Sequence, residues 1–228
     1  MATINTIEAR KNTNPKKKRE PSVSIRRRLN DAFRNRKKPV GRTLSTESVV
    51  EILTLAQEQG CTALFDLGAG AGLILEQAKA LGFAAVGGIE IDAEISGKNN
   101  NIFTTSFAEF NTDNADTWAS ISGGRKTLFY IYEGGLWDPQ WCLDAVKVVK
   151  KLAKLGNYIC IITHTGTTSF KKTWNIVQWK RNLSGLLGRE TKIPVSGDPG
   201  ADRQRENQMA HIYRVRRRNP KVVYALRL

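Results

Sequence analysis

The stretch that decides the fold is TALFDLGAGAGLILEQA, residues 62–78. An apolar run ends in Asp66, and three glycines follow at every second position, Gly68, Gly70 and Gly72. Glycines in such a loop let the backbone approach a ligand or a neighbouring element without an intervening side chain. The spacing alone fits three uses: a turn around the phosphates of a dinucleotide, a site for a sulfonium cofactor, or close packing of a helix on a strand.

Strand and helix patterns alternate along the chain. Strand patterns cover residues 62–67, 84–91, 102–106, 127–132, 157–163, 191–195 and 209–215, and helix patterns cover residues 46–59, 71–81, 93–99, 113–121, 139–155 and 170–183. Ser45 is the expected N-cap of the first helix. Five apolar strands separated by helices indicate a doubly wound α/β sheet, and the last two strands, joined by a polar loop at 196–207, fit an antiparallel hairpin. We therefore expect a mostly parallel seven-stranded sheet within residues 40–228.

Two acidic residues help to decide which of these three uses the glycine loop has. In a doubly wound sheet, ligands bind beyond the carboxyl ends of the strands, where residues 68–72 are expected to lie. Asp66 would repel a pyrophosphate and attract a cationic sulfonium. Glu90, in GGIEID, ends the next strand, and its carboxylate can accept both hydroxyls of a ribose. The combination favours a sulfonium nucleoside over a dinucleotide and over packing alone.

Asp66, the glycines and Glu90 together resemble motif I and the following acidic motif of class I S-adenosylmethionine-dependent methyltransferases, which have a Rossmann-like fold. The resemblance implies that the glycines line the methionine and ribose of S-adenosyl-L-methionine, that Asp66 lies near the amino-acid end, and that Glu90 holds the ribose. It also implies that the residues after the second and third strands sandwich the adenine. The expected cofactor-binding residues are Asp66, Gly68, Ala69, Gly70, Gly72, Glu90, Ile91, Ser106 and Phe107.

The segment after the fourth strand, YIYEGGLWDP at residues 130–139, faces the methyl acceptor by the same resemblance. It lacks the NPPY-like tetrad of enzymes that methylate exocyclic amines of bases. The order LSTESVVEIL, FDLGAGAG, VGGIEID, IYEGGLW and SGDPGADRQREN is similar to the non-SET histone lysine methyltransferases of the disruptor-of-telomeric-silencing type. This likeness implies a protein lysine as acceptor, with Tyr132, Glu133 and Trp137 lining the channel in which the lysine loses its proton. Transfer from a sulfonium is an in-line displacement, and we expect no metal.

Positive charge is concentrated at the amino terminus. The net charge is +15, and residues 1–42 hold 14 Lys and Arg against 3 Asp and Glu, which leaves +4 for the remaining 186 residues. We expect residues 1–39 to be a disordered basic tail that binds nucleic acid, either DNA in nucleosomes or RNA. Its basic runs also fit a nuclear address, so we expect the nucleus in a eukaryote and the cytoplasm otherwise.

Membrane, secretory and disulfide-rich classes are not indicated. No apolar run approaches the ~20 residues of a membrane span, and no apolar segment follows the first charges as in a signal peptide. The cysteines, Cys61, Cys142 and Cys160, form no CxxC pair, and we expect buried free thiols.

Two other functions stay open: an RNA methyltransferase that uses the same cofactor, and a nucleic-acid-binding protein with a methyltransferase-like scaffold. The intact acids and glycines of the cofactor motifs argue against the scaffold. Trp137, Trp141, Trp174 and Trp179 are expected to pack in the core or against helices more often than to clamp a substrate. His164 and His211 are expected to be structural or solvated.

Overall fold

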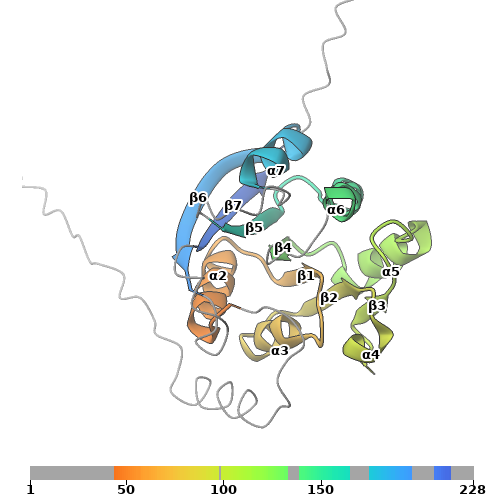
Figure 1. Cartoon of the computed structure of the whole chain (residues 1–228). Coiled ribbons are helices and arrows are strands. Elements are labelled where there is room, and N and C mark those ends of the chain that lie inside the picture. Colours follow the sequence, from red (N-terminus) through yellow and green to blue (C-terminus); the bar gives the residue numbers. More distant parts are fainter. Residues whose placement is uncertain (1–43, 98, 133–138, 165–174, 197–207, 217–228) are drawn as a thin grey trace, which may run out of the picture.

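The computed structural model describes residues 44–97, 99–132, 139–164, 175–196 and 208–216. They form one seven-stranded sheet in the order β3-β2-β1-β4-β5-β7-β6 (Figure 1). The strands from β1 to β5 pair in parallel, and β7 pairs antiparallel with both β5 and β6. The expected mostly parallel seven-stranded sheet is confirmed. The strands are β1 Ala63–Leu67, β2 Ala85–Glu90, β3 Ile102–Thr104, β4 Thr127–Tyr132, β5 Tyr158–His164, β6 Leu187–Val195 and β7 Gln208–Val215.

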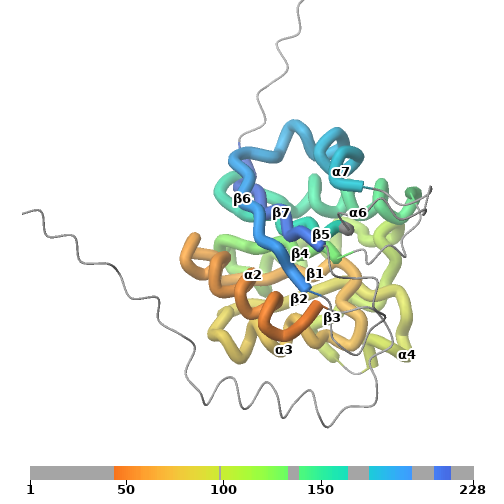
Figure 2. Tube along the Cα trace, turned by 60° about the vertical axis from the view of Figure 1, so that its left-hand side comes forward, coloured from red at the N-terminus to blue at the C-terminus, as the bar shows by residue number. Residues whose placement is uncertain are grey.

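Helices cover both faces of the sheet. On one face lie α2 (Thr46–Glu58) and α3 (Leu73–Ala80), and on the other lie α5 (Thr112–Ser122), α6 (Pro139–Leu152) and α7 (Ile176–Leu183) (Figure 1). The turned view also shows α2 and α3 together on one side (Figure 2). A short helix, α4 (Ala93–Ser96), contacts β2 and β3. The arrangement is a three-layer α/β sandwich with the sheet in the middle.

Each face of the sheet has its own core, because successive side chains of a strand point to opposite faces. Leu64 of β1 packs with the α2 and α3 side, whereas its neighbour Phe65 packs with the α5 and α6 side. β1 is buried at every position, as expected of a central parallel strand covered by helices on both faces. The Phe65 ring lies 4.8 Å from that of Trp118 on α5, measured between centroids, which anchors α5 to the sheet.

Local signals fix several helix ends. Ser45 is the N-cap of α2 as predicted, and its hydroxyl accepts a hydrogen bond from the Ser48 N–H at 3.3 Å. The α5 helix begins with a capping box between Asn111 and Asn114, which moves its start one residue ahead of the predicted residue 113. Trp179 on α7 is fully buried, as expected for a core tryptophan.

The β6 strand begins at Leu187, four residues before the predicted start at residue 191, so that boundary was wrong. Gly188 and charged residues at this end hid the strand pattern. A Cβ on Gly188 would lie 2.6 Å from the Arg214 carbonyl oxygen, so glycine permits a close approach to β7. The pairing is irregular between Leu187 and Glu190, where the register shifts.

Some expectations fall outside the described part of the chain. These are the tail at 1–39, residues 170–174 of the predicted last helix, and most of the loop at 196–207. Within the described ranges, no helix combines the length and apolar character needed to cross a membrane. The three cysteines are buried and free, as predicted.

Candidate cofactor site

The glycine loop, residues 68–72, connects β1 to α3 at the carboxyl end of the sheet. Gly68, Gly70 and Gly72 all have positive φ angles, 92°, 53° and 83°, which residues with side chains rarely adopt. The N–H groups of Gly68 and Ala69 both donate to the Ile89 carbonyl oxygen, at 3.0 and 2.8 Å. The loop therefore lies directly against the end of β2.

Gly88 on β2 makes this close contact possible. A Cβ at Gly88 would lie 2.7 Å from the Ala69 Cβ and 2.8 Å from the Asp66 carbonyl oxygen. Gly72, in turn, is the N-cap of α3, and a Cβ there would overlap the Asn99 side chain. Ala69 and Gly72 thus have packing roles in this structure, whereas Gly68 is exposed.

Glu90 fastens the glycine loop to the end of β2. Its Oε2 accepts the Gly70 N–H at 2.8 Å, and its Oε1 accepts the Asp92 N–H at 3.0 Å. The carboxylate is only partly buried. It therefore keeps lone pairs for further donors, because each carboxylate oxygen can accept two hydrogen bonds.

Asp66 lies beneath the loop and is 3% exposed. Its β1 register places it between Gly88 on β2 and Tyr130 on β4. Burial raises the pKa of its carboxyl to about 8, and the nearby charge of Glu90 adds to the rise. No hydrogen bond joins its carboxyl to another residue of the described part. A cation placed beside Asp66 would therefore stabilise its ionised form.

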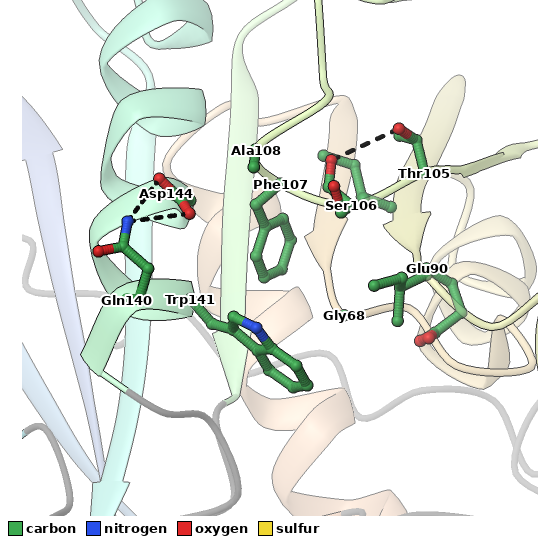
Figure 3. Close-up of a pocket in the computed structure, with 11 residues that line it drawn as sticks. Gly68, Glu90, Thr105, Ser106, Phe107, Ala108, Gln140, Trp141 and Asp144 are labelled. Atoms are coloured by element: carbon green, nitrogen blue, oxygen red, sulfur yellow. Dashed lines mark hydrogen bonds between the residues drawn. The ribbon is translucent and has the colours of Figure 1, made fainter.

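A cavity of about 290 Å³ opens beside the loop; we call it the Glu90 cavity. Figure 3 shows Phe107 and Trp141 between α6 and Glu90, with the loop residue Gly68 nearby. Five predicted cofactor-binding residues meet here, whereas Asp66, Ala69, Gly70 and Gly72 lie outside its lining. The lining residues are Gly68, Ile89, Glu90, Ile91, Thr105, Ser106, Phe107, Ala108, Gln140, Trp141 and Asp144.

The predicted adenine-side residues line the cavity in different ways. Ile91 is 57% exposed, an unusual state for a large apolar side chain and one that leaves it free to cover a ligand. Phe107 is partly buried against the α5 and α6 core. The Ser106 hydroxyl donates to Glu109 Oε2 at 2.8 Å, so this side chain is already engaged in the turn after β3.

The first turns of α6 supply a wall that the sequence did not indicate. Trp141, predicted to be a core residue, is instead 46% exposed and lines the cavity. Asp144 is buried, and Lys147 donates to it at 2.7 Å while Gln140 donates to both of its oxygens. The bond from Lys147 chiefly holds the pKa of Asp144 below its usual value. The three lining residues of α6, Gln140, Trp141 and Asp144, have a spacing (i, i+1, i+4) that is compatible with one helix face. Which face meets the cavity depends on the packing of α6.

Of the three residues expected to face the methyl acceptor, the structure describes Tyr132. Tyr132 ends β4 and is partly buried, and its hydroxyl oxygen accepts a hydrogen bond from Gln208 Nε2 at 3.4 Å. Glu133 and Trp137 lie outside the described residues. No group of His, Cys, Asp and Glu that could hold a metal ion occurs in the ranges that the structure describes.

Comparison with known proteins places the fold. No family model matches the chain, and no curated protein matches it in sequence. Among solved structures, the N-methyltransferase NodS of Bradyrhizobium japonicum, in complex with S-adenosyl-L-homocysteine, is similar with a TM-score of 0.57 and 15% identity, over 84% of this chain and 96% of that one. The methyltransferase domain of a bacterial Hen1 protein gives 0.52 and 10%, over 74% and 96%.

A Pyrococcus horikoshii protein assigned as an RNA methyltransferase is similar with a TM-score of 0.53 and 16% identity, over 86% of this chain and 99% of that one. These three structures share the class of fold rather than a close sequence. The chain therefore has the class I methyltransferase fold, as its cofactor motifs led us to expect.

Proposed function

We propose that this protein is an S-adenosylmethionine-dependent methyltransferase whose cofactor lies in the Glu90 cavity and along the glycine loop. The observation that carries the proposal is the Glu90 carboxylate, which is fixed by the Gly70 and Asp92 N–H groups at the mouth of the cavity. Its remaining lone pairs suit the two hydroxyls of a ribose. Structural neighbours with this fold are methyltransferases, and one holds S-adenosyl-L-homocysteine, which supports the same cofactor here.

The residues present fit the cofactor at each of its parts. Ile91, Phe107 and Trp141 offer apolar surfaces to the adenine, and Glu90 offers acceptors to the ribose. Asp66 offers a buried carboxyl that becomes an anion beside a cation. When bound, the cofactor supplies a methyl group on a positively charged sulfur, which a nucleophile removes by in-line displacement.

For the acceptor, we propose a protein lysine of the histone type. The support is the motif order of the sequence together with the position of Tyr132 at the end of β4, where the methyl acceptor is expected. Glu133, the next residue, is proposed to take up the lysine proton, and Trp137 to form a wall of the channel. The basic tail is proposed to hold nucleosomal DNA.

An RNA acceptor is the second candidate. The net charge of +15 suits RNA as well as DNA, and the Pyrococcus horikoshii neighbour is assigned as an RNA methyltransferase. In this case the tail and the residues after β4 would hold an RNA strand rather than a protein segment.

A transfer assay tests these proposals. The protein is incubated with tritiated S-adenosylmethionine and, in separate reactions, nucleosomes, free histones or total RNA. Label in histones that is lost in Glu133→Gln, with cofactor binding unchanged, supports the lysine proposal, and label in RNA selects the second candidate. Absence of both transfer and cofactor binding would overturn the methyltransferase proposal itself.

A further inference from the structure

A second cavity lies at the edge of the sheet opposite the Glu90 cavity; we call it the Lys151 cavity. Its volume is about 540 Å³, and it lies between α5, the turn that leads into β4, and the end of α6 with the segment before β5. The two cavities share no lining residue. The proposed methyl transfer makes no use of this second cavity.

The charge of this cavity is positive. Arg125, Lys126, Lys151 and Lys154 line it, and Asp116 is the acid among the described residues that do so. Both α5 and α6 end at this edge, and each helix carboxyl terminus carries about half a negative charge. The two termini and Asp116 together offset about two of the four cations, so a net positive charge remains.

Two of the cations are free to meet a ligand. Lys126 Nζ already donates to a carbonyl oxygen at the end of α2, at 2.9 Å, and Arg125 Nη1 donates to a carbonyl oxygen of the preceding turn, at 3.0 Å. Lys151 and Lys154 are exposed, and neither side chain has an ion-pair or hydrogen-bond partner among the described residues.

An amide side chain also lines the cavity. Asn157 lines the cavity and is 7% exposed. Its Oδ1 accepts the Thr127 N–H at 3.3 Å, and this contact fixes the orientation of the amide, because only its oxygen can accept. Its Nδ2 makes no hydrogen bond within the described ranges and is not one of the buried atoms that lack a partner, so it is an accessible N–H donor beside the lysines.

An apolar wall completes the cavity. Ala115 and Ala119 of α5 line it together with Leu152 and Leu155 from the end of α6, and Leu155 is 61% exposed. Free cations and an amide donor suit a phosphate, and an exposed apolar surface beside them suits a flat ring.

We propose that the Lys151 cavity binds a nucleotide unit, with its phosphate on Lys151, Lys154 and the Asn157 amide and its base against Leu155. The unit is either a free nucleotide or part of a nucleic-acid strand, since both carry this chemistry. Its described lining residues differ from those of the Glu90 cavity.

The test measures binding to the full chain with S-adenosylhomocysteine present, so that nucleotides do not enter the Glu90 cavity. Uridine monophosphate, inorganic phosphate and a labelled ten-nucleotide single-stranded RNA are the probes, followed by calorimetry or fluorescence anisotropy. The Lys151→Ala/Lys154→Ala variant is compared with Lys79→Ala/Lys150→Ala, which removes two exposed lysines outside the cavity. Circular dichroism verifies that each variant is folded.

We expect the cavity variant to bind uridine monophosphate at least fivefold more weakly, with the control variant unchanged. Inorganic phosphate should bind more weakly than the nucleotide. With RNA, the slope of log affinity against log salt should fall by about 1.4, because two phosphate contacts are lost. A loss confined to RNA assigns the site to a strand, and a loss for both probes assigns it to nucleotides in general.

Asn157→Asp keeps the acceptor for the Thr127 N–H and removes the free donor, so it should also weaken binding of the nucleotide. Equal losses in the two double variants would overturn the proposal, as would no binding of any probe. Unchanged binding of the nucleotide by Asn157→Asp would show that the Asn157 amide does not contact it. Failure of S-adenosylhomocysteine to bind would count against the cofactor site alone, because uridine monophosphate and RNA are measured independently of it.

Discussion

At the scale of single residues, Asp66 couples the proposed cofactor to pH. Its carboxyl is buried, and its pKa of about 8 keeps it largely protonated at neutral pH in the free protein. A sulfonium or ammonium group placed beside it favours the ionised form, so binding of the cation releases a proton. The Asp66 carboxyl is thus largely neutral in the free protein and ionised when a cationic group binds beside it.

We therefore predict that S-adenosylmethionine binds more tightly as pH rises from 6 to 7.5, by up to tenfold per pH unit. S-adenosylhomocysteine should show a smaller dependence because it lacks the sulfonium charge. Asp66→Asn should flatten both profiles. Calorimetry in buffers of different ionisation enthalpy measures the released proton, and an equal pH slope in the wild type and in Asp66→Asn would contradict the assignment.

The same residue should make the fold less stable as pH rises. Because the folded pKa lies above the ordinary value of 3.8, the folded state keeps a proton that the unfolded chain loses, and stability falls between about pH 4 and pH 8. Urea unfolding at pH 5 and pH 7.5 should show this loss in the wild type and a smaller one in Asp66→Asn.

At the scale of elements, the position of the glycine loop depends on the contact between β1 and β2. Gly88→Ala places a Cβ against Ala69 and the Asp66 backbone, and we predict a destabilisation of about 1–3 kcal/mol together with weaker cofactor binding. Gly185→Ala is the control, since a Cβ there meets nothing within 4 Å. Denaturant unfolding and calorimetry measure the two effects. Gly88→Ala behaving like Gly185→Ala would show that the loop does not need this contact.

A polar network joins β6, β7 and α7. Glu190 Oε1 accepts from the Tyr213 hydroxyl at 2.6 Å, lies 2.7 Å from His211 Nδ1, and forms an ion pair with Lys180 at 3.2 Å. Burial opposes ionisation of Glu190, yet the hydrogen bonds from Tyr213, His211 and Lys180 lower its pKa to about 2. His211 is buried in this network, which confirms the structural role expected for it.

Since the folded pKa of Glu190 lies below its ordinary value, the network contributes stability that is present above about pH 4.5 and lost as pH falls towards 2. We predict that Glu190→Gln lowers the free energy of unfolding at pH 6 by about 1–3 kcal/mol and that its difference from the wild type shrinks at pH 3. Urea unfolding at both pH values measures this. A difference that does not change with pH would contradict the ionic character of the network.

At the scale of the whole molecule, the features that could be predicted from the sequence are those that a local pattern of residues determines. The burial of β1 follows from its apolar residues. Asp66 and Glu90 could be placed near the ends of β1 and β2 because an acidic residue stands near the end of each apolar run. Parallel strands bring their carboxyl ends to one edge of the sheet, so the two acids were expected to lie close together. Ser45 was recognised as an N-cap because the cap is a local interaction.

The remaining features depend on contacts between distant segments. Trp141 lines the cavity together with residues 105–108, which follow β3, and no periodicity within residues 139–152 specifies this meeting of distant segments. The start of β6 was missed because Gly188 is explained only by its closeness to Arg214. The Lys151 cavity likewise gathers residues from two separated segments, 112–127 and 151–157, so it had no signal in the sequence.

The most direct test of the account is calorimetric titration of the protein with S-adenosylhomocysteine, compared between Glu90→Ala and the control Glu94→Ala. Glu94 is exposed, lies four residues further along the chain on α4, and does not line the Glu90 cavity. Loss of two hydrogen bonds to a charged acceptor, about 3 kcal/mol together, corresponds to about 100-fold weaker binding. We predict one-to-one binding by the wild type and by Glu94→Ala, and about 100-fold weaker binding by Glu90→Ala. Absence of binding by the wild type, or equal affinities in the three proteins, would contradict the proposed cofactor site.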